Sequence, residues 1–90
     1  MSGPRLKRLR YRAWHRGTRE LDLILGPFAD LNLTTMGPAE LDAFETLLGS
    51  PDPDIHDWVV RGAAPPASID RPTVARLRAS LGRASAGEGT

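Results

Sequence analysis

The apolar residues of this 90-residue chain recur at helical spacing in five short segments, and a glycine follows each segment. Residues three, four and seven apart lie on one face of an α-helix, whereas a half-buried strand would alternate apolar and polar residues. The chain contains no strand-like alternation and no internal repeat. The pattern therefore predicts an all-α fold, a small single-domain bundle of about five short helices.

Glycine and composition suggest where the ordered domain begins and ends. Gly17 follows the first segment, and glycine can take the left-handed conformation that terminates a helix. Nothing after Gly82 can bury apolar surface, so we expect residues 83–90 to be a disordered tail and residues 1–4 a frayed start. The domain over residues 5–82 is expected to form helices at residues 5–15, 18–32, 38–48 and 53–59, and a last helix that is capped by Ser68 or Asp70 and reaches Leu81.

The second segment carries the longest apolar stripe. Because the stripe continues beyond Pro27, we expect this helix to be kinked at Pro27 rather than to end there, although proline removes one backbone hydrogen bond. The stripe repeats at i, i+3, i+4, i+7 and i+10, which predicts a continuous buried face made of Leu21, Ile24, Leu25, Phe28 and Leu31.

The fourth helix has a start signal rich in proline and aspartate. Asp52 is expected to accept backbone N–H groups as a cap, with Pro53 at the first helical position and Asp54 beside it. Trp58 lies at helical spacing from Ile55 and is expected in the core. We therefore give Pro53, Asp54 and Trp58, like Pro27, a structural role.

Charge is segregated along the chain, although the net charge is only +1. Residues 1–19 carry seven Lys or Arg and no acid, whereas residues 20–60 carry nine Asp or Glu and no Lys or Arg. Two interpretations are open. The two blocks steer a charged partner from a distance, or they face each other in the fold and partly cancel.

Several classes of activity find no support in the residues. The absence of cysteine excludes disulfides, a thiol nucleophile and thiolate metal sites. The two histidines, His15 and His56, are far apart in the sequence and lack ligand-spaced partners, so we expect no metal site. No nucleophile elbow or phosphate-binding glycine pattern is present, so we predict no catalytic residue and no enzyme. No apolar run is long enough to span a bilayer, and we expect no membrane insertion.

A nucleic-acid-binding module is the alternative that composition keeps open. The first helix is basic and carries Tyr11 and Trp14, and clusters of Arg and Lys bind phosphates. Against this interpretation, the middle of the chain is acidic and the pI is about 8.4, whereas a nucleic-acid-binding domain usually exceeds about 9.

The segment HRGTRELD at residues 15–22 concentrates ionisable groups at a predicted helix corner. Arg16 offers a planar set of donors suited to a carboxylate, Gly17 permits close approach of another backbone, and Glu20 lies one helical turn further on. With Arg19 and Asp22, these residues predict a small protein-binding surface. The alternative is that Gly17 only ends a helix and that Arg16 and Glu20 form a surface ion pair contributing less than about 1 kcal/mol.

Together with a second segment, PDPDIHDW at residues 51–58, this corner resembles the SdhE family of FAD assembly factors for succinate dehydrogenase. The family's RGxxE signature is matched by Arg16, Gly17 and Glu20, and a PDxxxW element by Pro53, Asp54 and Trp58. The resemblance covers about residues 5–81 and implies a five-helix protein.

The resemblance implies a chaperone-like partner-binding function. Such a factor binds the flavoprotein subunit of succinate dehydrogenase, or of fumarate reductase, and promotes covalent attachment of FAD to a histidine of that subunit. FAD is then the partner's cofactor, and this chain holds none of its own. We expect a protein that is monomeric when free, resides in the bacterial cytoplasm and binds no nucleic acid. His15 matches no fixed residue of the family, and deletion of the tail is expected to be silent.

Overall fold

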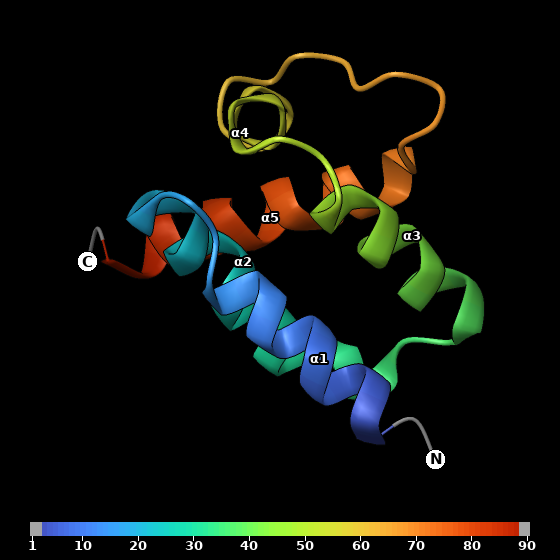
Figure 1. Cartoon of the computed structure of the whole chain (residues 1–90). Helices are drawn as coiled ribbons and strands as arrows, with labels where there is room; N and C mark the ends of the chain where they lie inside the picture. Colours follow the sequence, from blue (N-terminus) through green and yellow to red (C-terminus); the bar gives the residue numbers. More distant parts are fainter. Residues whose placement is uncertain (1–2, 89–90) are drawn as a thin grey trace.

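The computed structural model describes residues 3–88, and the side chains of residues 3–81. It confirms the all-α prediction (Figure 1). Helices α1 and α2 lie side by side, α5 crosses behind them, and a long loop leads from α4 to α5 (Figure 1). The elements are α1 (Gly3–Trp14), α2 (Arg19–Asn32), the 3-10 turn η1 (Leu33–Thr35), α3 (Pro38–Leu48), α4 (Asp52–Val59) and α5 (Arg71–Glu88).

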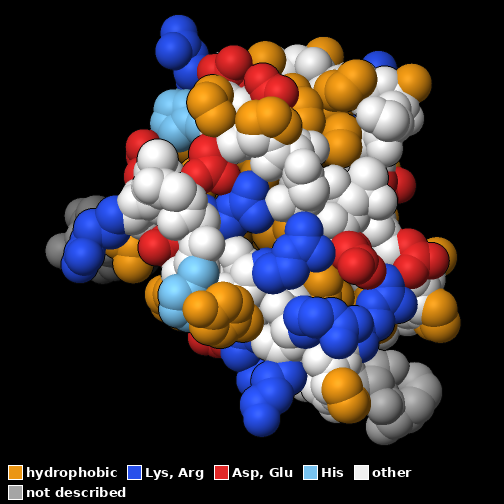
Figure 2. Space-filling view, in the orientation of Figure 1, with side chains coloured by type: hydrophobic (Ala, Val, Ile, Leu, Met, Phe, Trp, Pro, Cys, Tyr) orange, Lys and Arg blue, Asp and Glu red, His pale blue; other side chains and the backbone are white. Residues whose placement is uncertain are grey.

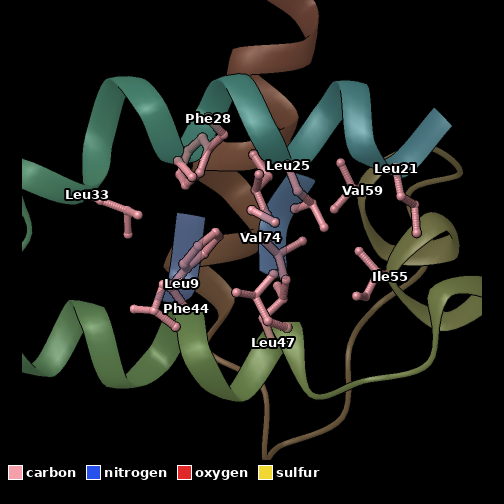
Figure 3. Packing of buried hydrophobic residues seen from close by; sticks show 14 of the residues in the cluster. Leu9, Leu21, Leu25, Phe28, Leu33, Phe44, Leu47, Ile55, Val59 and Val74 are labelled. Carbon is pink, nitrogen blue, oxygen red and sulfur yellow. The ribbon is translucent and has the colours of Figure 1, made fainter. Parts of the chain in front are cut away.

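One hydrophobic core joins all the helices. Figure 3 shows side chains from α2, α3, α4 and α5 pointing toward one another between the ribbons. Phe28 and Phe44 lie at its centre with ring centroids 5.6 Å apart. Trp58 is buried in this core, as its spacing from Ile55 predicted. The largest fully buried side chains are Phe28, Phe44, Leu9, Leu21, Leu25, Leu33, Leu47, Leu48, Ile55, Leu77 and Val74.

Helices α1 and α2 approach closely because α2 carries a glycine where the indole of Trp14 lies. A Cβ atom on Gly26 would come within 2.2 Å of that ring. The indole Nε1 donates to the carboxylate of Asp30, one turn further along α2, at 3.3 Å. Helix α2 continues through Pro27, in agreement with the prediction, and the kink expected there stays a prediction.

Leu31 was wrongly predicted to lie in the core, because its side chain is 75 % exposed. At 100° per residue, Leu31 lies about 80° from Leu21 on the side of the helix opposite to the buried Ala29, and so falls outside the buried face. Leu33 and Met36, in the segment expected to be a simple connection, are buried instead. The chain therefore fills this end of the core from η1 and the turn after it, and leaves Leu31 on the surface.

The first and the last helix both extend beyond the limits expected for the domain. Helix α1 begins at Gly3, within the start expected to be frayed, and proline at position 4 is well tolerated in a first helical turn. Helix α5 continues to Glu88, although disorder was expected after Gly82. Alanine and arginine favour the helix, and helical hydrogen bonds need no core. The expected frayed residues 1–2 and tail residues 89–90 lie outside the described part of the chain.

The basic and acidic blocks face each other, which was the second of the two interpretations of the charge pattern. Arg5 of α1 donates to Asp42 and Glu45 of α3 at 2.6 and 2.8 Å, and these hydrogen bonds raise the pKa of its guanidinium. Arg10 pairs with Asp30, and Arg12 with Glu45. Figure 2 shows Lys and Arg side chains over α1 with Asp and Glu beside them. Much of the basic charge that would bind phosphates is therefore paired within the chain.

The long loop between α4 and α5 is fixed at both of its ends. Gly62, with φ of 80°, is the only residue among those described that has a positive φ, and the following Ala63 N–H donates to Asp57 O at 2.8 Å. Asp70 caps α5 by accepting from the backbone N–H of Thr73 at 3.0 Å. Arg78 of α5 donates to Trp58 O and Ala63 O and so ties the loop to α5. Within residues 3–88, no helix is long and apolar enough to cross a membrane.

Candidate functional site

Arg16 lies at the centre of the corner between α1 and α2, and its guanidinium binds atoms of this chain. Nε donates to Asp52 Oδ1 at 2.9 Å, and Nη2 lies 2.8 Å from the same oxygen. Nη1 donates to Leu48 O at 2.6 Å and Nη2 to Ser50 O at 3.0 Å. The last carbonyls of a helix lack helical partners, and Arg16 supplies a donor to the last one of α3, Leu48 O, and another to Ser50 O just beyond the helix. Its side chain is only 12 % exposed, so Arg16 joins the corner to α3 and α4.

Gly17 has no side chain, and this lets the carboxylate of Asp52 lie directly against its backbone. The Gly17 N–H donates to Asp52 Oδ2 at 2.6 Å, and a Cβ at this position would lie 2.8 Å from the same oxygen. Its φ is not positive, so the left-handed helix stop expected here is wrong. That conformation occurs at Gly62 instead. The expectation that Asp52 caps α4 is also corrected, because Pro51 is the residue before the helix and the Asp52 carboxylate binds Arg16 and Gly17.

The start of α2 is fixed by two further side chains. Thr18 is the N-cap, and its hydroxyl accepts from Leu21 N at 3.4 Å. Asp22 in the first turn reaches back to the corner, where its Oδ1 accepts from Arg16 N at 2.6 Å. A negative charge in the first turn also interacts favourably with the unpaired backbone N–H groups at the start of the helix. Asp22 therefore stabilises the corner from the α2 side, as Asp52 does from the α4 side.

Glu20 points outward from the same turn of α2. Its side chain is 61 % exposed, and Oε1 lies 3.3 Å from His56 Nε2 of α4. The alternative that Arg16 and Glu20 form a surface pair is therefore wrong, because each has a different neighbour. From the sequence, His56 was weighed only as a metal ligand and was not placed in the binding surface, and its presence inside the PDPDIHDW segment was the available signal. The pairing joins the two segments on which the family resemblance depends.

A shallow hollow of about 310 Å³ lies between the first turn of α2 and α4. Glu20 and Thr18 line one side, and Pro53, His56 and Asp57 line the other, with Arg61 at its edge. Asp57 lies 3.8 Å from Arg61, and this pair is largely exposed. The hollow thus offers apolar surface rimmed by carboxylates and one imidazole, which suits a donor-bearing side chain.

The remaining predicted residues are more exposed. Arg19, in the first turn of α2, is exposed and forms no ion pair with the other residues whose side chains are described. Pro53 and Asp54 are exposed in the first turn of α4. His15 stacks on Tyr11 of α1 with ring centroids 3.9 Å apart. No group of three His, Cys, Asp or Glu side chains within the described residues could hold a metal ion.

Comparison with known proteins gives consistent matches. A family model described as "Flavinator of succinate dehydrogenase" matches residues 7–81. The chain is 38 % identical over 73 residues to the FAD assembly factor SdhE of Acetobacter pasteurianus, covering 81 % of this chain and 67 % of that protein. It is 33 % identical over 66 residues to the factor of the same name from Haemophilus ducreyi, covering 73 % of this chain and 80 % of the relative.

Mitochondrial proteins are similar as well. The chain is 39 % identical over 64 residues to succinate dehydrogenase assembly factor 2 of Dictyostelium discoideum, covering 71 % of this chain but only 45 % of that protein. The chain thus spans less than half the length of this mitochondrial relative. No solved structure matches this chain. Since this family model covers residues 7–81, and the bacterial and mitochondrial relatives are both named as assembly factors, this chain belongs to the family of flavinators of succinate dehydrogenase.

Proposed function

We propose that this chain is an assembly factor that binds the flavoprotein subunit of succinate dehydrogenase and promotes covalent attachment of FAD to a histidine of that subunit. The family model and the relatives' names support this function. The observation that carries the site is the exposed carboxylate of Glu20 at the rim of the hollow, on a helix start held rigidly by Arg16 and Asp52.

Within this site the residues divide into contacting and positioning groups. Glu20 accepts hydrogen bonds from donors of the flavoprotein, and the exposed Arg19 beside it contacts the same surface. Arg16, Gly17 and Asp22 hold the first turn of α2 in place through the contacts described above, so their effect on the partner is indirect. A preorganised surface loses less conformational entropy on binding than a mobile one.

The chemistry itself belongs to the partner. The flavin and the histidine that bonds to it are both on the flavoprotein, so this chain supplies no nucleophile and no cofactor of its own. Binding of the factor selects the flavoprotein conformation in which histidine and flavin lie in reacting geometry, which lowers the barrier by positioning. A fumarate reductase flavoprotein presents the same chemistry and is a second substrate under this proposal, and the free factor is a monomer.

Co-expression tests the proposal directly. The wild-type chain and a Glu20→Ala variant are each expressed with a succinate dehydrogenase flavoprotein subunit in cells lacking their own factor. Covalent flavin is then read from the fluorescence of the denatured subunit on a gel. Asp42→Ala is the matched control, since that carboxylate is 71 % exposed on α3, away from the hollow.

Each outcome has a defined meaning. We expect covalent flavin to rise with the wild type and with Asp42→Ala, and to fall to the level of the empty vector with Glu20→Ala. Equal signals from wild type and empty vector would overturn the proposed function. Equal signals from wild type and Glu20→Ala would leave the function standing and remove Glu20 from the site.

A further inference from the structure

Helix α2 has a second apolar face that folding does not use. Its inner face buries Leu21, Leu25 and Phe28, whereas Leu23 and Leu31 are 56 % and 75 % exposed. Single exposed leucines are common on protein surfaces. These two, however, are eight residues apart on one helix, with the half-buried Pro27 midway between them.

Glu20 belongs to the same face. At 100° per residue, Glu20, Leu23, Pro27 and Leu31 fall within a sector of about 80° around the helix axis. At 1.5 Å per residue, the stripe from Glu20 to Leu31 is about 17 Å long. We call these four residues the outer stripe. It begins at the carboxylate that we place in the partner-binding site and continues away from it along α2.

We propose that the outer stripe of α2 extends the docking surface beyond the RGxxE corner, and that an apolar patch of the flavoprotein subunit covers Leu23, Pro27 and Leu31. This inference rests on the proposed function. The expected partner surface is about 17 Å long, the helix rise over eleven residues: an apolar strip of about 12 Å that covers Leu23 to Leu31, and a cationic or N–H donor at the end that meets Glu20. Interfaces commonly combine such an apolar centre with charged contacts near its edge.

The charge on the stripe argues against a second copy of this chain as the occupant. A two-fold interface pairs the same surface with itself. With the stripes antiparallel, the Glu20 carboxylate of one copy would lie against Leu31 of the other; with the stripes parallel, the two carboxylates would face each other. Either arrangement desolvates the Glu20 carboxylate and brings it no donor beyond the His56 imidazole of its own chain, which is costly. A partner that places a donor opposite Glu20 avoids this cost.

A double variant tests the inference. Leu23→Gln with Leu31→Gln keeps the size of both side chains and removes their apolar ends. Tyr11→Gln is the control, because Tyr11 is 63 % exposed but lies on α1. The dissociation constant for a purified succinate dehydrogenase flavoprotein subunit is measured by calorimetry for each protein and for Glu20→Ala, and sedimentation gives the oligomeric state.

We expect each leucine substitution to raise the dissociation constant about tenfold, because burying a leucine side chain in an interface strengthens binding by about that factor or more. The two positions are about 12 Å apart along the axis, so the double variant should lose about a hundredfold, as effects at separated sites add. Tyr11→Gln should bind as the wild type does. All variants should unfold at the wild-type temperature, because the substituted side chains are exposed.

The other outcomes overturn the inference in distinguishable ways. If the double variant binds within about twofold of the wild type while Glu20→Ala binds weakly, the stripe is outside the interface and the proposed function stands. If a wild-type dimer is lost in the double variant with unchanged flavoprotein affinity, the stripe joins two copies instead. If the wild type itself does not bind the subunit, the proposed function fails and the inference fails with it.

Discussion

Replacing Asp52 by asparagine tests whether the corner depends on one carboxylate. The substitution keeps the shape of the side chain but turns one of its two terminal oxygens into an NH2 group. Oδ1 accepts from Arg16 Nε at 2.9 Å, and Oδ2 accepts from Gly17 N at 2.6 Å. In either orientation of the amide, one of these N–H groups would face another donor.

The expected loss of stability follows from the burial of the pair. Hydrogen bonds to charged groups contribute about 1.5–3 kcal/mol each, and breaking a fully buried pair costs about 3–5 kcal/mol. The side chains of Arg16 and Asp52 are 12 % and 17 % exposed, so the upper range does not apply in full. We expect Asp52→Asn to lower the free energy of unfolding by about 2–3 kcal/mol. For a domain of this size that lowers the melting temperature by about 10–20 °C.

Asp54→Asn is the matched control for this measurement. Both aspartates lie in the first turn of α4, so each substitution removes one favourable charge from the helix N-terminus, worth about 0.3–1 kcal/mol. Asp54 is exposed, whereas Asp52 is held against Arg16. Chemical denaturation monitored by circular dichroism compares the two variants. If they unfold within about 0.5 kcal/mol of each other, Asp52 does not hold the corner and our account of Arg16 is wrong.

Three further substitutions separate the roles of packing, backbone conformation and the chain end. Gly26→Ala should lower the free energy of unfolding by about 1–3 kcal/mol, because its Cβ would overlap the indole of Trp14, and a shift in Trp fluorescence should accompany the loss. Gly62→Ala should cost only about 1–2 kcal/mol in denaturant unfolding, since its φ is 80° but no atom lies near a new Cβ. A cost below about 1 kcal/mol for Gly26→Ala would contradict the close approach of α1 and α2. Deletion of residues 83–90 should change neither the melting temperature nor covalent flavin in co-expression, and a loss of either would assign that segment a role.

Local patterns in the sequence predicted the helices but not the partners of their polar side chains. The spacing of apolar residues identified every helix and placed Trp58 in the core, because periodicity depends only on neighbours along the chain. Leu31 was misplaced because the helix has about 3.6 residues per turn. A stripe that starts at Leu21 and is extended in steps of three therefore drifts around the helix axis until its last residue no longer faces the core. The ends at Gly3 and Glu88 were missed because helical hydrogen bonds extend past the last buried residue.

The roles of Arg16, Gly17 and Asp52 could not be predicted for a different reason. Arg16 and Asp52 are 36 residues apart, and nothing in either local pattern states that they meet. An aspartate before a proline at a helix start is usually a cap, and a glycine after a helix is usually a stop. Tertiary contacts overrode both tendencies, because the Asp52 carboxylate accepts hydrogen bonds from the Arg16 side chain and from the Gly17 backbone at once.

The contact also explains why two short segments, HRGTRELD and PDPDIHDW, occur together in one chain. Each looks like a separate signal in the sequence, yet Arg16 and Gly17 bind Asp52, and Glu20 lies beside His56. The first segment therefore provides the exposed carboxylate, and the second holds it in place and forms the far wall of the hollow. Substitutions in the second segment should thus impair partner binding even where their side chains never reach the partner. Under the proposed function, we expect Arg16, the most nearly buried member of the RGxxE pattern, to act by the same indirect route, and we expect Glu20 to be the member that contacts the partner.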